Sequence, residues 1–268
     1  MNRVAVVTGG TSGIGLETAK ALYRKGFTVY CLSRKAVGAP EYTHIPCDIS
    51  DEAACREAVR TIIGREGRID VLVNNAGFGI SGAIEFTESA ESRKLMDVNL
   101  FGADNMTRSV LPFMRKAGKG RIVNISSVAG PLAIPFQAWY SVSKAAVIAY
   151  TNALINEVRP YGVTACAILP GDIRTGFTAA REKSAKGDAE YGGRIEKSVA
   201  RMEKDEINGM DPAAAGKYIA GIAAKKKIKP QYTVGLAYKL FVVLGRLLPV
   251  RFVTWGVGML YGEWGKEK

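Results

Sequence analysis

The sequence predicts an α/β fold: one domain with a doubly wound parallel sheet and a helical extension at its C-terminus. Short apolar runs alternate with helical stretches along the chain, a pattern that is typical of βαβ units. A glycine-rich loop follows the first apolar run directly, at residues 9–15. The 268 residues, 47% of them hydrophobic, suit one large domain with a substantial core. We therefore predict a single domain over residues 1–268.

Six apolar runs are predicted to form the strands: Val4–Thr8, Thr28–Leu32, His44–Cys47, Val71–Asn74, Arg121–Ile125 and Thr164–Leu169. A helix is predicted over Gly15–Lys25, because a glycine, which is a typical C-cap, follows it. Asp51 and Glu52 predict the start of a second helix, since acidic residues and an N-cap are typical of a helix N-terminus. A third helix is predicted from Trp139 to Val158.

Two segments after the sixth strand lie outside this alternating pattern. Residues 173–210 are polar and charged with glycines among them, which favours a lid over a substrate site, with ordinary surface helices as the alternative. Residues 235–262 form an amphipathic tail, in which Lys239, Arg246 and Arg251 interrupt an apolar run. Such a tail can gate a substrate or touch a membrane surface, and the alternative is an oligomer contact or closure of the core.

The charge of the chain is strongly basic and uneven. The net charge is +12, and residues 212–268 hold ten Lys or Arg against two Glu. We interpret this as a solvated basic face, with attraction to anionic lipid or substrate as the alternative, and we expect no nucleic-acid partner. No leader-like segment precedes the first predicted strand, so we expect a cytoplasmic protein.

The histidine and cysteine content argues against a metal site. The four cysteines form no CxxC pair, so buried thiols in a reducing compartment are the expectation. His44 is the only histidine, which leaves no histidine-based triad, and we interpret it as structural. We therefore predict that no metal is bound.

The glycine loop predicts a dinucleotide site of the Rossmann type. Gly9 permits the tight turn, Gly13 lets the backbone approach a pyrophosphate, and Gly15 allows the following helix to pack closely. At the end of the second strand, where a carboxylate would select NAD, the chain has Ser33 and Arg34. An arginine there can bind a 2′-phosphate through charge-assisted hydrogen bonds, so the predicted cofactor is NADP(H).

Tyr140 and Lys144 predict the catalytic chemistry. Residues four apart share one face of a helix, which brings the lysine ammonium beside the phenol. A nearby cation favours the phenolate, lowers the pKa of the tyrosine and suits it to act as a general acid or base. Ser127 ends the fifth predicted strand, where its hydroxyl could hold the carbonyl oxygen that Tyr140 protonates.

With these motifs the sequence resembles the short-chain dehydrogenase/reductase family over Val4 to Thr175. The resemblance implies a catalytic set of Asn99, Ser127, Tyr140 and Lys144, in which Asn99 would keep a proton-relaying water. It also implies cofactor contacts from Gly9, Thr11, Ser12, Gly13, Ile14, Gly15, Ser33, Arg34, Asp48, Ile49, Asn75, Ala76, Gly77, Tyr140, Lys144, Pro170, Gly171, Ile173 and Thr175. It further implies hydride transfer between the nicotinamide and a carbonyl carbon, and a homodimer or homotetramer.

The substrate is expected to be lipophilic. Residues 128–139 carry no charge and include Phe136 and Trp139, with Phe78, Ile80 and Phe177 as further apolar candidates. The tail is similar to those of hydroxysteroid dehydrogenases and acyl-dihydroxyacetone phosphate reductases of the family, so the predicted substrate is a steroid-like or acyl ketone.

Two alternatives to this function are weighed against it. The first is a 3-oxoacyl-thioester reductase of lipid synthesis, for which the basic tail would meet an acidic carrier. The second is a non-catalytic NADP(H)-sensing regulator, which the presence of both Tyr140 and Lys144 disfavours.

Overall fold

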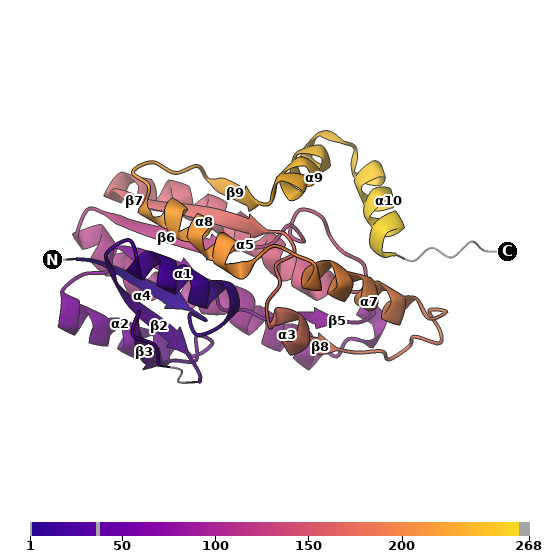
Figure 1. The fold of residues 1–268 in the computed structure, drawn as a ribbon, viewed down its shortest axis with the longest axis horizontal. Coiled ribbons are helices and arrows are strands. Elements are labelled where there is room, and N and C mark those ends of the chain that lie inside the picture. The colour runs from indigo at the N-terminus through magenta and orange to yellow at the C-terminus, as the bar shows by residue number, and fades with distance from the viewer. Residues whose placement is uncertain (1, 36–37, 263–268) are drawn as a thin grey trace.

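A computed structural model describes residues 2–35 and 38–262 (Figure 1). Its centre is a seven-stranded parallel sheet in the order β3-β2-β1-β4-β6-β7-β9. The strands are β1 (Arg3–Thr8), β2 (Phe27–Ser33), β3 (Thr43–Pro46), β4 (Val71–Asn74), β6 (Gly120–Ile125), β7 (Val163–Pro170) and β9 (Gln231–Val234). The order runs outward in both directions from β1 and β4, so the predicted doubly wound α/β fold is confirmed. The edge strand β9 was not among the predicted strands.

Helices cover both faces of the sheet because its strands are apolar on both sides. On one face, Ala5 and Val7 of β1 pack in a cluster with α1 (Gly13–Tyr23) and α8 (Pro212–Ala224). On the other face, Val4 and Val6 pack in a cluster with α2, α4 and α5. These three helices are α2 (Glu52–Glu66), α4 (Gly102–Lys116) and α5 (Ala138–Val158). This double cover fixes the strand ends, and with them the loops that form the site.

Local signals explain where the predicted helices begin and end. The Asp51 carboxylate accepts hydrogen bonds from the Ala53 and Ala54 amides and caps α2, as the sequence indicates. Gly67, at φ +69°, ends that helix in the left-handed conformation. The first helix begins at Gly13, two residues earlier than predicted, so the glycine loop itself supplies the first turn of α1.

Shorter elements lie in the connections between the sheet strands. They are β5 (Ile80–Ser81), η1 (Ile84–Phe86), α3 (Ser89–Met96), η2 (Asp97–Phe101) and η3 (Arg159–Tyr161). The element η2 is a π-helical turn that joins α3 to α4.

The predicted lid segment, residues 173–210, begins and ends at neighbouring points of the structure. Ile173 and Met210 form a β-bridge where the segment leaves and rejoins the body. Between them lie α6 (Phe177–Ala180), β8 (Glu182–Lys183) and α7 (Arg194–Ile207). The strand β8 pairs with β5, so this segment is attached to the loop after β4 as well. Its motion as a lid remains a prediction.

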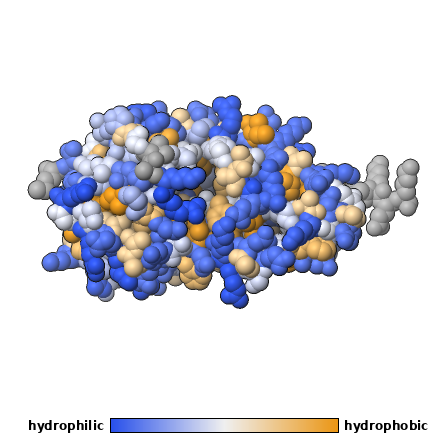
Figure 2. Space-filling view, turned by 90° about the horizontal axis from the view of Figure 1, so that it is seen from below, coloured by the Kyte–Doolittle hydropathy of each residue, from blue (hydrophilic) through white to orange (hydrophobic). Residues whose placement is uncertain are grey.

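The C-terminal extension consists of two helices, α9 (Leu236–Leu247) and α10 (Val250–Tyr261). Together these form the C-terminal helix pair, which stands off the body in yellow at the upper right of Figure 1. In a view from below that figure, the surface is mainly hydrophilic (Figure 2). Among the helices that the structure describes, none has both the length and the apolar character needed to cross a membrane.

Candidate active site

A cavity of about 560 Å³ opens at the carboxyl ends of the central strands. In parallel α/β sheets this edge is where ligands bind, because the loops that follow the strands converge there. The cavity brings together all but two of the sequence-predicted site residues: Gly9, Thr11, Ser12, Gly13, Ile14, Ser33, Arg34, Asp48, Ile49, Asn75, Ala76, Gly77, Ser127, Tyr140, Lys144, Pro170, Gly171, Ile173 and Thr175. Gly15 and Asn99 lie outside its lining.

The glycine loop has the shape that a pyrophosphate requires. Gly9 and Gly13 adopt φ values of +61° and +51°, which favour glycine, and α1 begins directly after the loop. A Cβ on Gly15 would lie 2.2 Å from the Gly9 carbonyl oxygen, so only glycine fits there. Gly15 therefore packs directly against Gly9 of the loop, although it does not line the cavity. The N-terminus of α1 faces the cavity with free amide groups, and these residues fit a bound dinucleotide.

A chain of hydrogen bonds organises the end of β2. The Thr11 hydroxyl donates to the Ser33 hydroxyl at 3.1 Å, and Ser33 donates to the Lys35 carbonyl at 2.8 Å. The His44 ring nitrogen Nε2 lies 2.9 Å from the same Ser33 oxygen. Arg34 is exposed at the cavity rim. His44 thus supports the segment that presents Arg34, which agrees with its structural interpretation.

Asp48 and Asn75 hold the loops on either side of the adenosine end. Hydrogen bonds from Ser50 lower the pKa of Asp48, against a smaller effect of burial, and Arg34 lowers it further. The Asn75 side-chain amide donates to the Thr8 carbonyl at 3.0 Å, and its backbone amide donates to the Thr8 hydroxyl at 3.0 Å. The loop after β4 is therefore fastened to the glycine loop.

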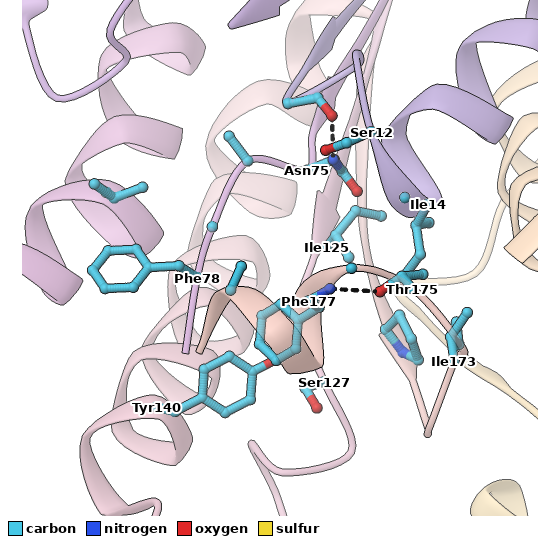
Figure 3. A pocket seen from close by; sticks show the side chains of 18 of the residues that line it. Ser12, Ile14, Asn75, Phe78, Ile125, Ser127, Tyr140, Ile173, Thr175 and Phe177 are labelled. Atoms are coloured by element: carbon cyan, nitrogen blue, oxygen red, sulfur yellow. Dashed lines mark hydrogen bonds between the residues drawn. The ribbon is translucent and has the colours of Figure 1, made fainter. Parts of the chain in front are cut away.

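Ser127, Tyr140 and Lys144 meet at the other end of the cavity. Ser127 follows β6, and the two other residues lie on consecutive turns of α5. The Lys144 ammonium Nζ lies 5.6 Å from the centroid of the Tyr140 ring and donates to the Ile125 carbonyl at 3.0 Å. In Figure 3 the rings of Tyr140 and Phe177 lie side by side near Ser127, while Ser12 and Asn75 lie at the far end. The Tyr140 and Phe177 ring centroids are 5.6 Å apart.

Burial is the main cause of the pKa shifts of Tyr140 and Lys144. It raises the pKa of Tyr140 to about 12, although a hydrogen bond with Ser127 acts in the opposite direction. Burial also lowers the pKa of Lys144 to about 8. We had expected Lys144 to lower the pKa of the tyrosine. In this structure desolvation of the phenol outweighs any such effect, because both side chains are enclosed by protein.

Asn99 lies behind the cavity rather than in its wall. It is buried in the π-helical turn η2, and such turns are frequent at functional sites. Its side-chain oxygen accepts from the Phe78 amide at 3.0 Å, and its amide donates to the Phe78 carbonyl and to Ser143. Asn99 therefore holds the loop after β4 against α5. The role in proton relay stays a prediction.

Sequence reasoning missed four residues that line the substrate end: Asp172, Met202, Glu206 and Tyr261. Three of them come from the lid segment and the C-terminal helix pair, where no motif points to a site. Asp172 directly follows Pro170 and Gly171, but its residue type alone carries no signal. Within the described ranges, no three His, Cys, Asp or Glu side chains are placed to hold a metal ion.

The two carboxylates among these residues differ in their partners. Glu206 forms an ion pair with the buried Arg181 and accepts a hydrogen bond from the Thr178 hydroxyl at 2.6 Å. Asp172 accepts a hydrogen bond from the Tyr238 hydroxyl. Burial raises the pKa of Asp172, and the Tyr238 hydrogen bond opposes this. The charge of Glu206 is thus balanced within the protein, whereas Asp172 is bonded to a neutral hydroxyl.

Comparison with known proteins shows the family to which the chain belongs. The sequence model described as short chain dehydrogenase matches residues 3–186. The chain is 38% identical over 263 residues to a 3-ketodihydrosphingosine reductase of Bacteroides thetaiotaomicron, covering 97% of this chain and 98% of that protein. The chain therefore belongs to the short-chain dehydrogenase/reductase family, whose members are oxidoreductases that bind a nicotinamide cofactor.

Solved structures agree with this assignment. A short-chain dehydrogenase from Streptomyces avermitilis superposes with a TM-score of 0.84 at 31% identity, covering 94% of each chain. A structure described as ElxO with NADP bound superposes with a TM-score of 0.74 at 26% identity, covering 90% of this chain and all of that one. The fold is thus that of the family.

Proposed function

We propose that this enzyme uses NADPH to reduce the ketone of a long-chain lipid with a cationic head group, giving the secondary alcohol. The first candidate substrate is 3-ketodihydrosphingosine. One observation carries the proposal: a single cavity joins Arg34 and Ser33 at one end to Ser127, Tyr140 and Lys144 at the other.

Support for NADPH comes from the end of β2. The exposed cations Arg34 and Lys35 directly follow Ser33, and no carboxylate stands in their place. A guanidinium binds a phosphate through charge-assisted, bidentate hydrogen bonds, whereas it offers nothing specific to a 2′-hydroxyl. The similar ElxO structure, which has NADP bound, is consistent with this preference.

The chain's own residues would hold and protonate the substrate. When bound, the nicotinamide supplies the hydride. Tyr140, which stays protonated at neutral pH, donates the proton to the ketone oxygen, and Ser127 orients that oxygen. The Lys144 ammonium donates to the Ile125 carbonyl; it would bind the cofactor ribose and stabilise negative charge on Tyr140.

Support for a cationic head group comes from Asp172. The lining near Tyr140 is apolar, with Phe177 and Met202, but it includes the Asp172 carboxylate. A carboxylate attracts an ammonium and repels the phosphate of an acyl-thioester carrier. An amino ketone therefore suits this end of the cavity better than a 3-oxoacyl thioester, which was the alternative. The 38% identity to a 3-ketodihydrosphingosine reductase supports the same choice.

The test is NADPH consumption by the purified protein with three ketone classes: 3-ketodihydrosphingosine, a 3-oxoacyl thioester and a ketosteroid. We expect the amino ketone to be reduced with the highest kcat/KM, and NADH to substitute poorly. A Tyr140→Phe variant controls for contaminating reductases. Faster turnover of the thioester or the steroid would contradict the proposed substrate, and no turnover of any ketone would contradict the proposed function.

A further inference from the structure

A second cavity lies beside the active site, under the C-terminal helix pair. Its volume is about 440 Å³, within the range of roughly 300–1,000 Å³ that is usual for ligand pockets. It is partly open to solvent and is bordered by the loop of residues 130–135, by one side of α5, by Arg194 of α7 and by α10. Its walls include Ala133, Pro135, Val142 and Val257.

The polar groups in these walls are already bonded within the protein. The Ser141 hydroxyl accepts from the Ile134 amide at 3.2 Å, and the Thr254 hydroxyl donates to the Val250 carbonyl at 2.8 Å. The Arg194 guanidinium donates twice to the Gly262 carbonyl, at 2.9 and 2.8 Å. A ligand in this cavity would therefore meet apolar surface and satisfied polar groups, which suits a hydrocarbon and not a polar molecule.

The two cavities adjoin each other. Ile134 lines both of them, and at the end of α10 Tyr261 lines the first while Gly262 lines the second. The first cavity contains Tyr140, so a ketone held there has an apolar space behind the Ile134 side chain. A ketone that carries a head group on one side and a long chain on the other would need two adjoining cavities of this kind.

We propose that the second cavity binds the alkyl chain of the ketone substrate, with Ile134 at the junction between chain and reacting group. This rests on the proposed function, since it extends the same substrate. The cavity then selects for chain length, because each methylene that enters leaves water. By the usual value of about 0.8 kcal/mol per buried methylene, kcat/KM should rise up to about fourfold per added carbon until the cavity is full.

The test fills the cavity without touching the catalytic residues. Val257→Trp places an indole in it, and Met259→Trp, on the exposed side of the same helix, is the matched control. The kcat/KM values are measured with NADPH for amino ketones that share one head group and differ only in chain length. We expect Val257→Trp to lower kcat/KM at least about tenfold for long chains and to leave short chains unchanged, because several methylenes lose their site. Met259→Trp should behave as wild type.

Two results would overturn the proposal: an unchanged chain-length profile in Val257→Trp, or an equal loss for short and long chains. A wild-type enzyme that reduces no ketone in the series would instead reject the proposed function. Binding of a fluorescent long-chain alkylamine to wild type and Val257→Trp then tests the cavity by itself. Equal binding by the two proteins would reject the alkyl site.

A separate observation concerns the outer surface of the C-terminal helix pair. Leu247 and Val250 flank its turn with exposed fractions of 76% and 79%, and Leu236 is 86% exposed. Further large apolar side chains exposed on the pair are Leu240, Phe241, Val243, Leu244, Leu248, Phe252, Trp255, Met259 and Leu260. Apolar patches of this extent are typical of interaction surfaces.

The pair is attached to the body at several points: Val242 of α9 packs on Ala167 and Leu169 of β7, and the Arg246 guanidinium donates to the Gln231 side chain of β9 at 2.6 Å. At the first helix, Tyr238 donates to Asp172, and at the end of the second, Tyr261 donates to Asp205 at 3.2 Å. Figure 1 shows the turn between α9 and α10 at the top of the view, above the rest of the molecule.

The charged residues around the turn between α9 and α10 indicate what kind of surface binds there. Arg246 and Arg251 stand on either side of the apolar turn, and residues 212–262 contain no Asp or Glu. Apolar side chains bordered by cations are the pattern by which helices lie in the interface of an anionic membrane. The geometry points to an anionic lipid surface as the partner of this helix pair. The pair also walls the alkyl cavity, so a lipid substrate would enter close to the membrane.

The test is sedimentation of the purified protein with vesicles of phosphatidylcholine alone or with added phosphatidylglycerol. We expect binding to the anionic vesicles, weakening with salt, and loss of binding in Leu247→Ser combined with Val250→Ser. Reduction of a short-chain ketone should be unchanged in that variant. Failure to bind the anionic vesicles would overturn the proposal. A wild-type dimer that the double variant dissolves, with no vesicle binding, would assign the surface to a second copy of the chain.

Discussion

The cofactor end and the substrate end of the cavity are built in different ways. The cofactor end consists of loops that directly follow β1, β2 and β4, whose side chains are buried on both faces of the sheet. The substrate end takes residues from the lid segment and from α10, which lie outside the seven-stranded sheet and are joined to each other by the hydrogen bond from Tyr261 to Asp205. The register of the sheet therefore determines the cofactor site, whereas chain after residue 171 determines which substrate reaches Tyr140.

The largest effect is expected where the two ends meet. Tyr140→Phe removes the proton donor and keeps the ring that packs on Phe177. We expect kcat for ketone reduction to fall by roughly 10²- to 10⁴-fold, the usual contribution of a general acid. NADPH binding, measured by fluorescence titration, should be unchanged. A variant that keeps more than about a tenth of the wild-type kcat would remove Tyr140 from the mechanism.

A change at the cofactor end should leave the substrate end untouched. Arg34→Asp replaces the cation at the rim with a carboxylate that repels the 2′-phosphate. Loss of charge-assisted hydrogen bonds costs about 1.5–3 kcal/mol, so the KM for NADPH should rise roughly 10- to 150-fold. The KM for the ketone should stay as in wild type, and that for NADH should not rise. An unchanged KM for NADPH would contradict the cofactor assignment.

A change at the substrate end should weaken binding of the ketone and leave binding of NADPH unchanged. Asp172→Asn keeps the volume and can still accept from Tyr238, but it removes the negative charge. We expect KM for an amino ketone to rise about tenfold, in line with a single hydrogen-bonded charge, with KM for NADPH unchanged. The matched control is the same ketone without its amino group, which should be insensitive to the substitution. Equal effects on both ketones would reject head-group recognition by Asp172.

The smallest effect is expected from pH. Burial lowers the pKa of Lys144 to about 8, so the ammonium is present below that pH and lost as pH rises through it. Tyr140, with its pKa raised to about 12, remains a proton donor throughout this range. For the ketone without an amino group, whose binding does not depend on the charge of Asp172, kcat/KM should therefore be constant below pH 8 and fall above it. A profile that is flat on both sides of pH 8 would mean that Lys144 does not need its charge.

The sequence predicted the cofactor end well for a physical reason. Gly15 has no room for a side chain, and Gly9 and Gly13 adopt positive φ values that favour glycine, so the spacing of these glycines is readable without a structure. The same holds for the spacing of Tyr140 and Lys144 on one helix. The strand β9 escaped prediction because its four residues have mixed polarity and lie at the sheet edge.

The substrate end was less predictable. Met202, Glu206 and Tyr261 reach the cavity through the packing of segments far apart in the sequence, and no local pattern records that packing. The burial that raises the pKa of Tyr140 is also a property of the assembled site and not of the helix on which it lies. The sequence indicated a lid at residues 173–210 and an amphipathic tail at residues 235–262, but neither the side chains that reach the first cavity nor the second cavity beside α10.

The central claim is hydride transfer from NADPH to the ketone carbon of a lipid. The most direct measurement uses NADPH with deuterium in both hydrogen positions at the nicotinamide C4, incubated with 3-ketodihydrosphingosine and the wild-type enzyme, with the product analysed by mass spectrometry. The account predicts one deuterium on the carbon that bears the new hydroxyl, and this product should form roughly 10²- to 10⁴-fold more slowly with Tyr140→Phe. An alcohol product without deuterium, or no alcohol from the wild-type enzyme, would contradict it.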